Sequence, residues 1–293
     1  MLAECIRELA IDPTGTYVDV TFGGGGHSKE ILSHLTTGRL LAFDQDEDAK
    51  KESKKIDAPN FTFIEANFRF LEKYLRLHGV RKVDGILADL GISSHQIDTA
   101  ERGFSTRFDA ELDMRMNQQS AFTARDVVNT YPVEKLHRIL GQYGELKNAR
   151  TAAQAIVAAR SAKEIITIND LKHSLQNLLP RGKENKYLAQ VFQALRIEVN
   201  EEMQALEDFL KDTPKVLKPN GRLVIMSYHS LEDRPVKNFL RSGKFRGEVE
   251  KDFYGNDIKP LQALTRKPIE ATAEEVSENP RARSAKLRVA TIK

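Results

Sequence analysis

Four consecutive glycines, residues 23–26, stand directly before His27 and Ser28. They follow TYVDVTF (16–22), a run of β-forming residues. Because glycine has no Cβ, Gly25 and Gly26 can bring backbone N–H groups close to a ligand. A tight turn before a helix is the alternative interpretation, and the glycines alone do not decide between the two.

Polar or aromatic residues also end the next three apolar runs. Asp44 ends the run 38–46, Phe68 ends 60–68, and Asp89 lies at the end of 82–91. Ligands of parallel sheets bind outside the carboxyl ends of the strands, where a carboxylate contacts the ribose hydroxyls of a nucleotide. We expect this role for Asp44 and an adenine contact for Phe68. A surface acid and a core phenylalanine are the alternatives.

The glycine spacing narrows the choice of cofactor. Gly23 and Gly25 fit the dinucleotide pattern G-x-G-x-x-G, but Ser28 stands at its third glycine position. No lysine follows the glycines as in a P-loop, which argues against a nucleoside triphosphate. S-adenosylmethionine, which has ribose hydroxyls and no phosphate, fits better.

Strands and helices alternate regularly over the first ninety residues, which predicts an α/β fold with a parallel sheet covered on both faces. The strand pattern resumes at 221–230 and 285–292. Between these parts, residues 104–190 show helical spacing and little strand signal. The sequence therefore predicts an α/β domain of residues 1–103 and 191–293, interrupted by an all-α insertion, with a long surface loop at 242–280.

Composition is that of a globular protein of 293 residues, 40% hydrophobic and 30% charged, with a net charge of +3. This mild positive charge permits an RNA partner without requiring one. No apolar run is long enough to span a membrane and the first residues do not form a signal peptide, so we expect a cytoplasmic protein. The single cysteine, Cys5, excludes an internal disulfide. No His, Cys or acidic cluster has metal-ligand spacing, so we expect no catalytic metal.

Eight motifs occur together in one order: TFGGGGHS, LAFDQD, LADLGISSHQID, ERGFS, LDMRM, FQALRIEVN, SYHSLEDR and NPRARSAKLR. With this set the chain resembles the bacterial MraW family, also called RsmH, over nearly its whole length. This sequence differs from the usual family pattern at three places. Members often have arginine where Gly24 stands and proline where His95 stands. They also usually begin with a short segment before the part that matches MLAEC.

The resemblance implies a Rossmann-like, S-adenosylmethionine-dependent methyltransferase with an inserted helical domain that helps to recognise RNA. Its implied substrate is the N4 amino group of a cytidine in the decoding region of small-subunit ribosomal RNA. The implied cofactor contacts are Gly25, Gly26, His27, Asp44, Phe68, Asp89 and Gln96.

Two residues are candidates for the chemistry that the resemblance implies. Asp89 is placed to accept a hydrogen of the target amine, although binding the cofactor alone is nearly as good an interpretation. His229, with an ordinary pKa near ~6.5, is a candidate proton acceptor or a structural histidine. Tyr228 is expected to stack on a flipped base.

RNA contacts are expected to be mainly electrostatic, with a steep salt dependence. Residues 104–190 carry 13 Lys and Arg against 9 Asp and Glu. The basic tail 279–288 adds Arg281, Arg283 and Arg288. The expected partner is small-subunit ribosomal RNA or the assembled small subunit, and the expected state is a monomer or homodimer. A methyltransferase of another substrate, a non-catalytic assembly factor and an NAD-dependent oxidoreductase are the competing functions.

Overall fold

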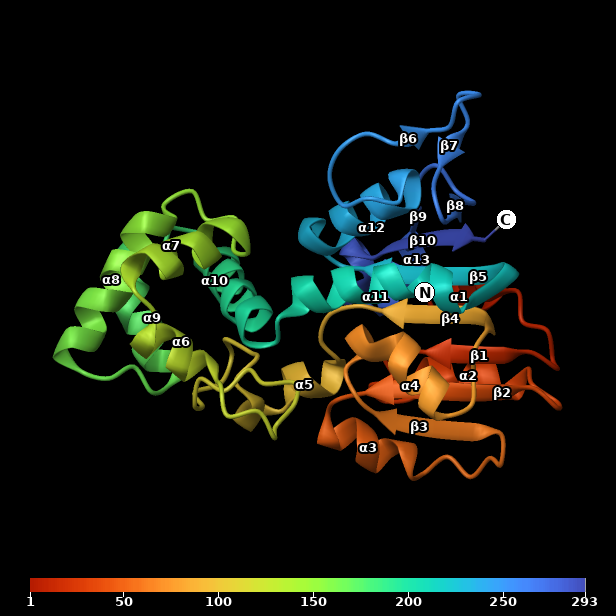
Figure 1. Cartoon of the computed structure of the whole chain (residues 1–293). Coiled ribbons are helices and arrows are strands. Elements are labelled where there is room, and N and C mark those ends of the chain that lie inside the picture. The colour runs from red at the N-terminus through yellow and green to blue at the C-terminus, as the bar shows by residue number, and fades with distance from the viewer. Residues whose placement is uncertain (293) are drawn as a thin grey trace. The chain divides into compact units, whose positions relative to one another are not determined.

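The computed structural model describes residues 1–292 and divides into two compact units. One unit comprises residues 1–91 and 203–292 and is built around a sheet (Figure 1). The other comprises residues 92–202 and is helical. Each unit is described by itself below.

Five parallel strands form the centre of the sheet unit, in the Rossmann-like order β3-β2-β1-β4-β5. Their bounds are Thr16–Asp19 (β1), Arg39–Asp44 (β2), Phe61–Glu65 (β3), Val83–Asp89 (β4) and Leu217–Ser227 (β5). Strand β10 (Lys286–Thr291) continues the sheet antiparallel to β5, and β8 (Gln262–Ala263) follows it. The predicted α/β fold with a parallel sheet is confirmed.

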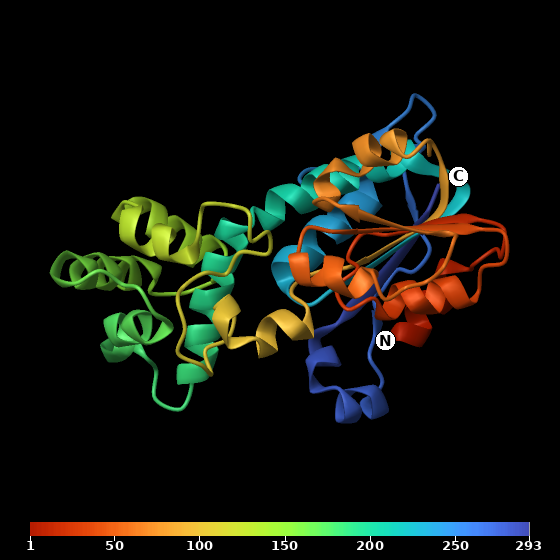
Figure 2. The same cartoon turned by 90° about the horizontal axis from the view of Figure 1, so that it is seen from below.

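Helices cover both faces of this sheet, as Figure 2 shows. Neighbouring strand residues point to opposite faces: Val18, Leu41 and Ile86 belong to one hydrophobic core, and Tyr17, Leu40 and Leu87 to the other. Both faces are buried under helices, which explains why the strand sequences are continuously apolar. The helices of this unit are α1 (Leu2–Leu9), α2 (Gly26–Ser33), α3 (Glu47–Ser53), α4 (Leu71–Leu77), α11 (Glu202–Val216), α12 (Ser230–Ser242) and α13 (Ala273–Glu278), with short 3-10 turns η1 (Phe68–Phe70) and η4 (Pro280–Ser284).

The helical unit has a hydrophobic core of its own. Its elements are α5 (Ser94–Asp98), η2 (Ala100–Arg102), α6 (Ala124–Thr130), α7 (Val133–Gln142), α8 (Ala149–Ala162), α9 (Ile168–Leu175), η3 (Gln176–Leu178) and α10 (Glu184–Val199). The unit is wider than the predicted insertion 104–190. Helix α10 crosses the predicted boundary, and its Val191, Phe192 and Leu195 are buried in the helical core.

The segment 242–280 is not one continuous loop, and that prediction was wrong. It contains a hairpin of β6 (Glu250–Lys251) and β7 (Asp257–Ile258), while β8 and β9 (Ile269–Glu270) pair with β10. Strands of two residues are too short to leave an alternating pattern in the sequence. Within residues 1–292, no helix combines the length and apolar character needed to cross a membrane.

Candidate active site

The glycine loop joins β1 to α2 at the carboxyl edge of the sheet. Gly25 has φ +76°, and a Cβ there would lie 2.7 Å from Cζ of Phe22, so only glycine fits. Gly24 and Gly26 differ, because a Cβ on either would meet no atom within 4 Å. One glycine is therefore required by the turn, and two border open space.

Two N–H groups of this loop are hydrogen-bonded within the chain and two are not. Gly25 donates to the carbonyl of Phe22 at 2.7 Å, and Gly23 donates to Oδ2 of Asp44 at 2.8 Å. The N–H groups of Gly26 and His27, at the first turn of α2, have no acceptor within the described part of the chain. A ligand therefore has access to Gly26 and His27, while the N–H of Gly25 is already used, contrary to what the sequence suggested for it.

Asp44 links the end of β2 to the glycine loop. Its second oxygen, Oδ1, accepts the N–H of Asp46 at 2.9 Å. Burial raises the pKa of this carboxyl to about 6. A carboxylate has about four acceptor sites, so two remain for ligand hydroxyls.

Asp19 is a site residue that the sequence analysis missed. It ends β1 with no exposed surface and accepts the hydroxyl of Ser28 at 2.7 Å and the N–H of Thr21 at 3.1 Å. Burial raises the pKa of Asp19, while His27 opposes this shift. The contact also explains the serine at the third glycine position. A polar residue ending an apolar strand was the available signal.

Asp89 receives contacts from three segments of the sheet unit. The Tyr228 hydroxyl donates to its Oδ1 at 2.8 Å, and Nδ1 of His27 lies 3.8 Å from its Oδ2. The Asp89 N–H donates to Oγ1 of Thr21 at 2.7 Å. Burial raises the pKa of Asp89 to about 6, an effect that His27 and the Tyr228 hydrogen bond reduce. His27 and Asp89, which were both expected to contact the cofactor, are thus brought together.

Tyr228 makes a polar contact that the sequence did not predict. Its hydroxyl holds Asp89, and its ring packs partly buried against the core that contains Met226 and Leu287. The geometry therefore makes it a positioning group for a carboxylate. Base stacking by its ring stays a prediction.

His229 pairs with a buried carboxylate that the sequence analysis also missed. Its Nε2 lies 3.0 Å from Oε1 of Glu232, whose Oε2 accepts the N–H of Tyr228 at 2.9 Å. Glu232 is 2% exposed. Because it contacts both Tyr228 and His229, it fixes the turn between β5 and α12. A held imidazole suits both a structural and a proton-accepting role, so the catalytic role of His229 stays a prediction.

Phe68 and Gln96 contact residues other than the glycine loop, Asp44 and Asp89. Phe68 opens η1 after β3, half-buried, with its ring in edge contact with Phe209 at a centroid distance of 5.5 Å. Gln96 belongs to the helical unit, where it forms a capping box with Ser93 at the start of α5. Its contact with a cofactor rests on the family resemblance alone.

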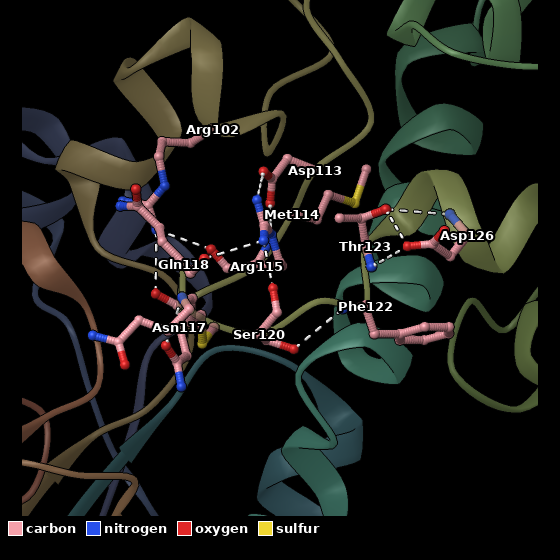
Figure 3. Close-up of polar contacts among 12 residues, drawn as sticks. Arg102, Asp113, Met114, Arg115, Asn117, Gln118, Ser120, Phe122, Thr123 and Asp126 are labelled. Atoms are coloured by element: carbon pink, nitrogen blue, oxygen red, sulfur yellow. Dashed lines mark hydrogen bonds and ion pairs between the residues drawn. The ribbon is translucent and has the colours of Figure 1, made fainter.

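Two of the family motifs build a loop within the helical unit (Figure 3). The Arg115 guanidinium donates to both oxygens of Asp113, at 2.8 and 2.6 Å, and to the carbonyls of Gln118 and Ser120. Arg102, 7% exposed, donates to the carbonyl of Arg115 at 2.9 Å. These two arginines therefore stabilise the loop 113–120 from within.

Arg288 is placed against the expectation for the basic tail. It is 8% exposed, and its guanidinium binds both oxygens of Asp233, at 2.7 and 3.0 Å. Arg288 therefore does not share an exposed surface with Arg281 and Arg283, which lie in η4. An inward position on β10, which pairs with β5, explains the difference. Residues 1–292 contain no group of three His, Cys, Asp or Glu side chains placed to hold a metal ion.

Bacterial proteins resemble this chain over nearly its full length. A protein of Cytophaga hutchinsonii is 59% identical over 290 residues, covering 99% of this chain and 97% of its own. One of Phocaeicola vulgatus is 55% identical over 291 residues, covering 99% and 95%. Both are named ribosomal RNA small subunit methyltransferase H.

Similarity to solved structures is weaker. An rRNA methylase from Streptococcus thermophilus is 13% identical with a TM-score of 0.40, covering 99% of this chain and 93% of its own. Fibrillarin from Aeropyrum pernix, solved with bound S-adenosyl-L-methionine, is 13% identical with a TM-score of 0.39, covering 99% and 74%.

The family model described as MraW methylase matches residues 1–293. The cofactor of such a methylase is S-adenosylmethionine. Together with relatives of 55–59% identity, this match covers the sheet unit, the helical unit and every motif at the site. The chain therefore belongs to the MraW methylase family.

Proposed function

We propose that this protein transfers the methyl group of S-adenosylmethionine to the N4 amino group of a cytidine in the decoding region of small-subunit ribosomal RNA. The names of the relatives support small-subunit ribosomal RNA as the substrate. The cytidine N4 atom and the decoding region rest on the family resemblance of the motifs. The structural observation that carries the proposal is Asp89, held by Tyr228 beside the glycine loop.

The residues present fit this cofactor. Gly24 and Gly26 border open space, and Nε2 of His27 is buried with no hydrogen-bond partner among the described residues. We expect Gly26, His27, Asp44, Phe68, Asp89 and Gln96 to hold it, while Gly25, whose N–H is bonded to Phe22, shapes the turn before Gly26 and His27. When bound, the cofactor supplies a methyl group on a positively charged sulfur. The carboxylates of Asp44 and Asp89 suit ribose hydroxyls and positive charge.

Asp89 also suits the amine that accepts the methyl group. The lone pair of cytosine N4 is delocalised into the ring, so an acceptor for one N4 hydrogen increases the electron density on nitrogen. Tyr228 occupies one acceptor site of Oδ1 of Asp89, which leaves the second site of Oδ1 and both sites of Oδ2 for a ligand. Holding the amine in line with the methyl carbon is worth up to roughly 7–11 kcal/mol.

A proton must leave N4 after methyl transfer. His229 is the proposed acceptor, since Glu232 holds its imidazole at the end of β5. The alternative assigns Asp89 to the cofactor alone and leaves His229 as a structural residue.

The decisive experiment uses labelled S-adenosylmethionine and small ribosomal subunits that lack the modification, followed by nuclease digestion and mass analysis of the nucleosides. We expect N4-methylcytidine from the wild type and its loss in Asp89→Ala. Asp57→Ala, which removes an exposed carboxylate after α3, is the matched control and should retain activity. A methylated nucleoside other than N4-methylcytidine, or no product despite cofactor binding, would refute the proposed substrate.

A further inference from the structure

The helical unit carries a group of exposed cations that its own acids do not neutralise. Its other Lys and Arg side chains pair with acids or donate to backbone carbonyls. The cations without such a partner among residues 1–292, here called the basic cluster, are Lys147, Arg150, Arg181, Lys183 and Lys186. They lie in the segments 145–150 and 181–186, whose only acids are Glu145 and Glu184. Both segments therefore carry a net positive charge.

Packing within the helical unit brings these two segments together. Helix α7 packs against both α8 and α10 (Figure 1). The Tyr187 hydroxyl donates to Oδ1 of Asn148 at 3.2 Å, across 39 positions of sequence, and the Gln190 amide donates to the carbonyl of Gly144 at 2.9 Å. Tyr187 directly follows one basic segment and Asn148 lies within the other. The cations of both segments are thus gathered at one end of the helical unit.

The positions of these cations are unfavourable for the isolated protein. Arg150 lies in the first turn of α8, which contains no acid, and Lys183 is the N-cap of α10. A helix N-terminus carries partial positive charge, so cations there destabilise the helix, and neighbouring cations also repel one another. Stability of the fold therefore does not explain the basic cluster, whereas a negatively charged partner would offset both effects.

The surroundings of the basic cluster favour a phosphate backbone over a protein surface as this partner. Protein interfaces have an apolar and often aromatic centre. Among the described residues, none of the exposed large apolar side chains lies in 145–150 or 181–186, and Tyr187 beside them is only 5% exposed. The surface therefore also lacks an exposed ring on which a base could stack. Phosphates, by contrast, are bound by lysine and arginine alone.

We propose that the basic cluster binds the phosphate backbone of the ribosomal RNA substrate, independently of its base sequence. This inference rests on the proposed function for the identity of the RNA, and it adds the residues and the kind of contact. Phosphate contacts position a protein on a nucleic acid, whereas base contacts select the sequence. The basic cluster therefore anchors the RNA, and selection of the cytidine is left to other residues.

The test uses the triple variant Arg150→Gln/Lys183→Gln/Lys186→Gln. Affinity is measured from about 50 to about 200 mM salt, for an RNA oligonucleotide of mixed sequence and for small subunits that lack the modification. Each phosphate contact contributes roughly 0.7–0.9 to the slope of log affinity against log salt concentration, so this slope should fall by roughly two to three. At about 0.1 M salt both RNAs should bind at least about tenfold more weakly. Cofactor affinity should not change.

The matched control is Arg39→Gln/Lys54→Gln/Arg81→Gln. It removes the same charge from exposed cations that have no ion-pair partner within residues 1–292 and lie at the amino ends of the parallel strands. The control should keep the affinity and salt slope of the wild type. The free energy of unfolding of the test variant should not fall, because glutamine has a similar helix propensity and relieves the repulsion.

Weaker RNA binding with a reduced salt slope in the test variant alone would support the proposal. An unchanged slope, or an equal loss in the control, would overturn it. Weaker binding to subunits with unchanged binding to the oligonucleotide would also overturn it, since the partner would then be a ribosomal protein. Failure of the proposed function is distinguishable, because the oligonucleotide assay reports on the basic cluster even when no N4-methylcytidine forms.

Discussion

At the residue scale, Asp89 combines a half-buried position with the neighbours that control its charge. His27 and Tyr228 favour its carboxylate, whereas burial and the nearby acids Asp19 and Glu232 disfavour it. The result is a pKa near 6, high for an aspartate and still below neutral pH. Small changes in its surroundings therefore alter its charge at mildly acidic to neutral pH.

We predict that kcat/KM falls below about pH 6 as Asp89 becomes protonated. Tyr228→Phe removes a hydrogen bond to the carboxylate, so the pKa of Asp89 should rise and the acidic limb should move to higher pH. The pH profile measures this shift. Tyr74→Phe, which removes a hydroxyl that does not contact Asp89, is the control. A Tyr228→Phe profile with unchanged midpoint would show that Tyr228 does not position this carboxylate.

Stability should show the opposite pH dependence in the cofactor-free protein. The folded-state pKa of Asp89 lies above its ordinary value of 3.8, so its stabilising contribution is full below about pH 4 and is lost as pH rises through 6. Asp89→Asn should therefore increase the free energy of unfolding at pH 8 while abolishing activity. Urea unfolding at pH 8 checks this, and a destabilised Asp89→Asn variant would contradict it.

Gly25 provides a test of the turn itself. Gly25→Ala places a Cβ against Phe22 at positive φ, so both stability and cofactor affinity should fall. Gly79→Ala, with φ +70° and no atom within 4 Å of the added Cβ, introduces the backbone strain without the clash. Calorimetric cofactor binding should thus be weakened only in Gly25→Ala. Equal cofactor affinities in the two variants would show that this turn does not contribute to cofactor binding.

At the element scale, the Arg288–Asp233 pair joins β10 to the first turn of α12. Arg288→Leu removes both hydrogen bonds of the Asp233 carboxylate and leaves it only Lys286, whose Nζ lies 3.9 Å from its Oδ2. We predict a loss of up to roughly 3–5 kcal/mol in the free energy of unfolding. Adding Asp233→Asn to this variant should recover part of the lost free energy of unfolding. Exposed Arg283→Leu should change stability by at most about 0.5 kcal/mol. Denaturant unfolding tests these values, and a fully stable Arg288→Leu would contradict them.

At the scale of the whole molecule, the two units have separate hydrophobic cores. We predict two thermal transitions by calorimetry. Cofactor at about 100 times its Kd stabilises the unit that binds it by about 2.7 kcal/mol. The transition of the sheet unit should therefore rise most. Hydrogen exchange in β4 and α8 assigns the transitions, and one cooperative transition would show that the cores unfold together.

The sequence alone predicted the sheet and most of the residues at the carboxyl ends of its strands. Strands buried on both faces leave continuous apolar runs, and glycines and acids at their ends are visible as breaks in those runs. For this reason Gly25, Asp44 and Asp89 could be placed at the carboxyl ends of the strands without a structure, whereas His27 was expected to contact the cofactor from the family resemblance. The motif order determined the family, which the match over residues 1–293 confirms.

Only the tertiary structure decided which polar groups pair across distant segments. Tyr228 meets Asp89 across 139 positions of sequence, and Arg288 meets Asp233 across 55. Neither contact leaves a periodic signal, because it depends on the order of strands in the sheet and on the rotamers of single side chains. Burial of Asp19 and Glu232 has the same origin. The chain's local pattern thus specifies its elements, whereas packing decides which charges those elements enclose.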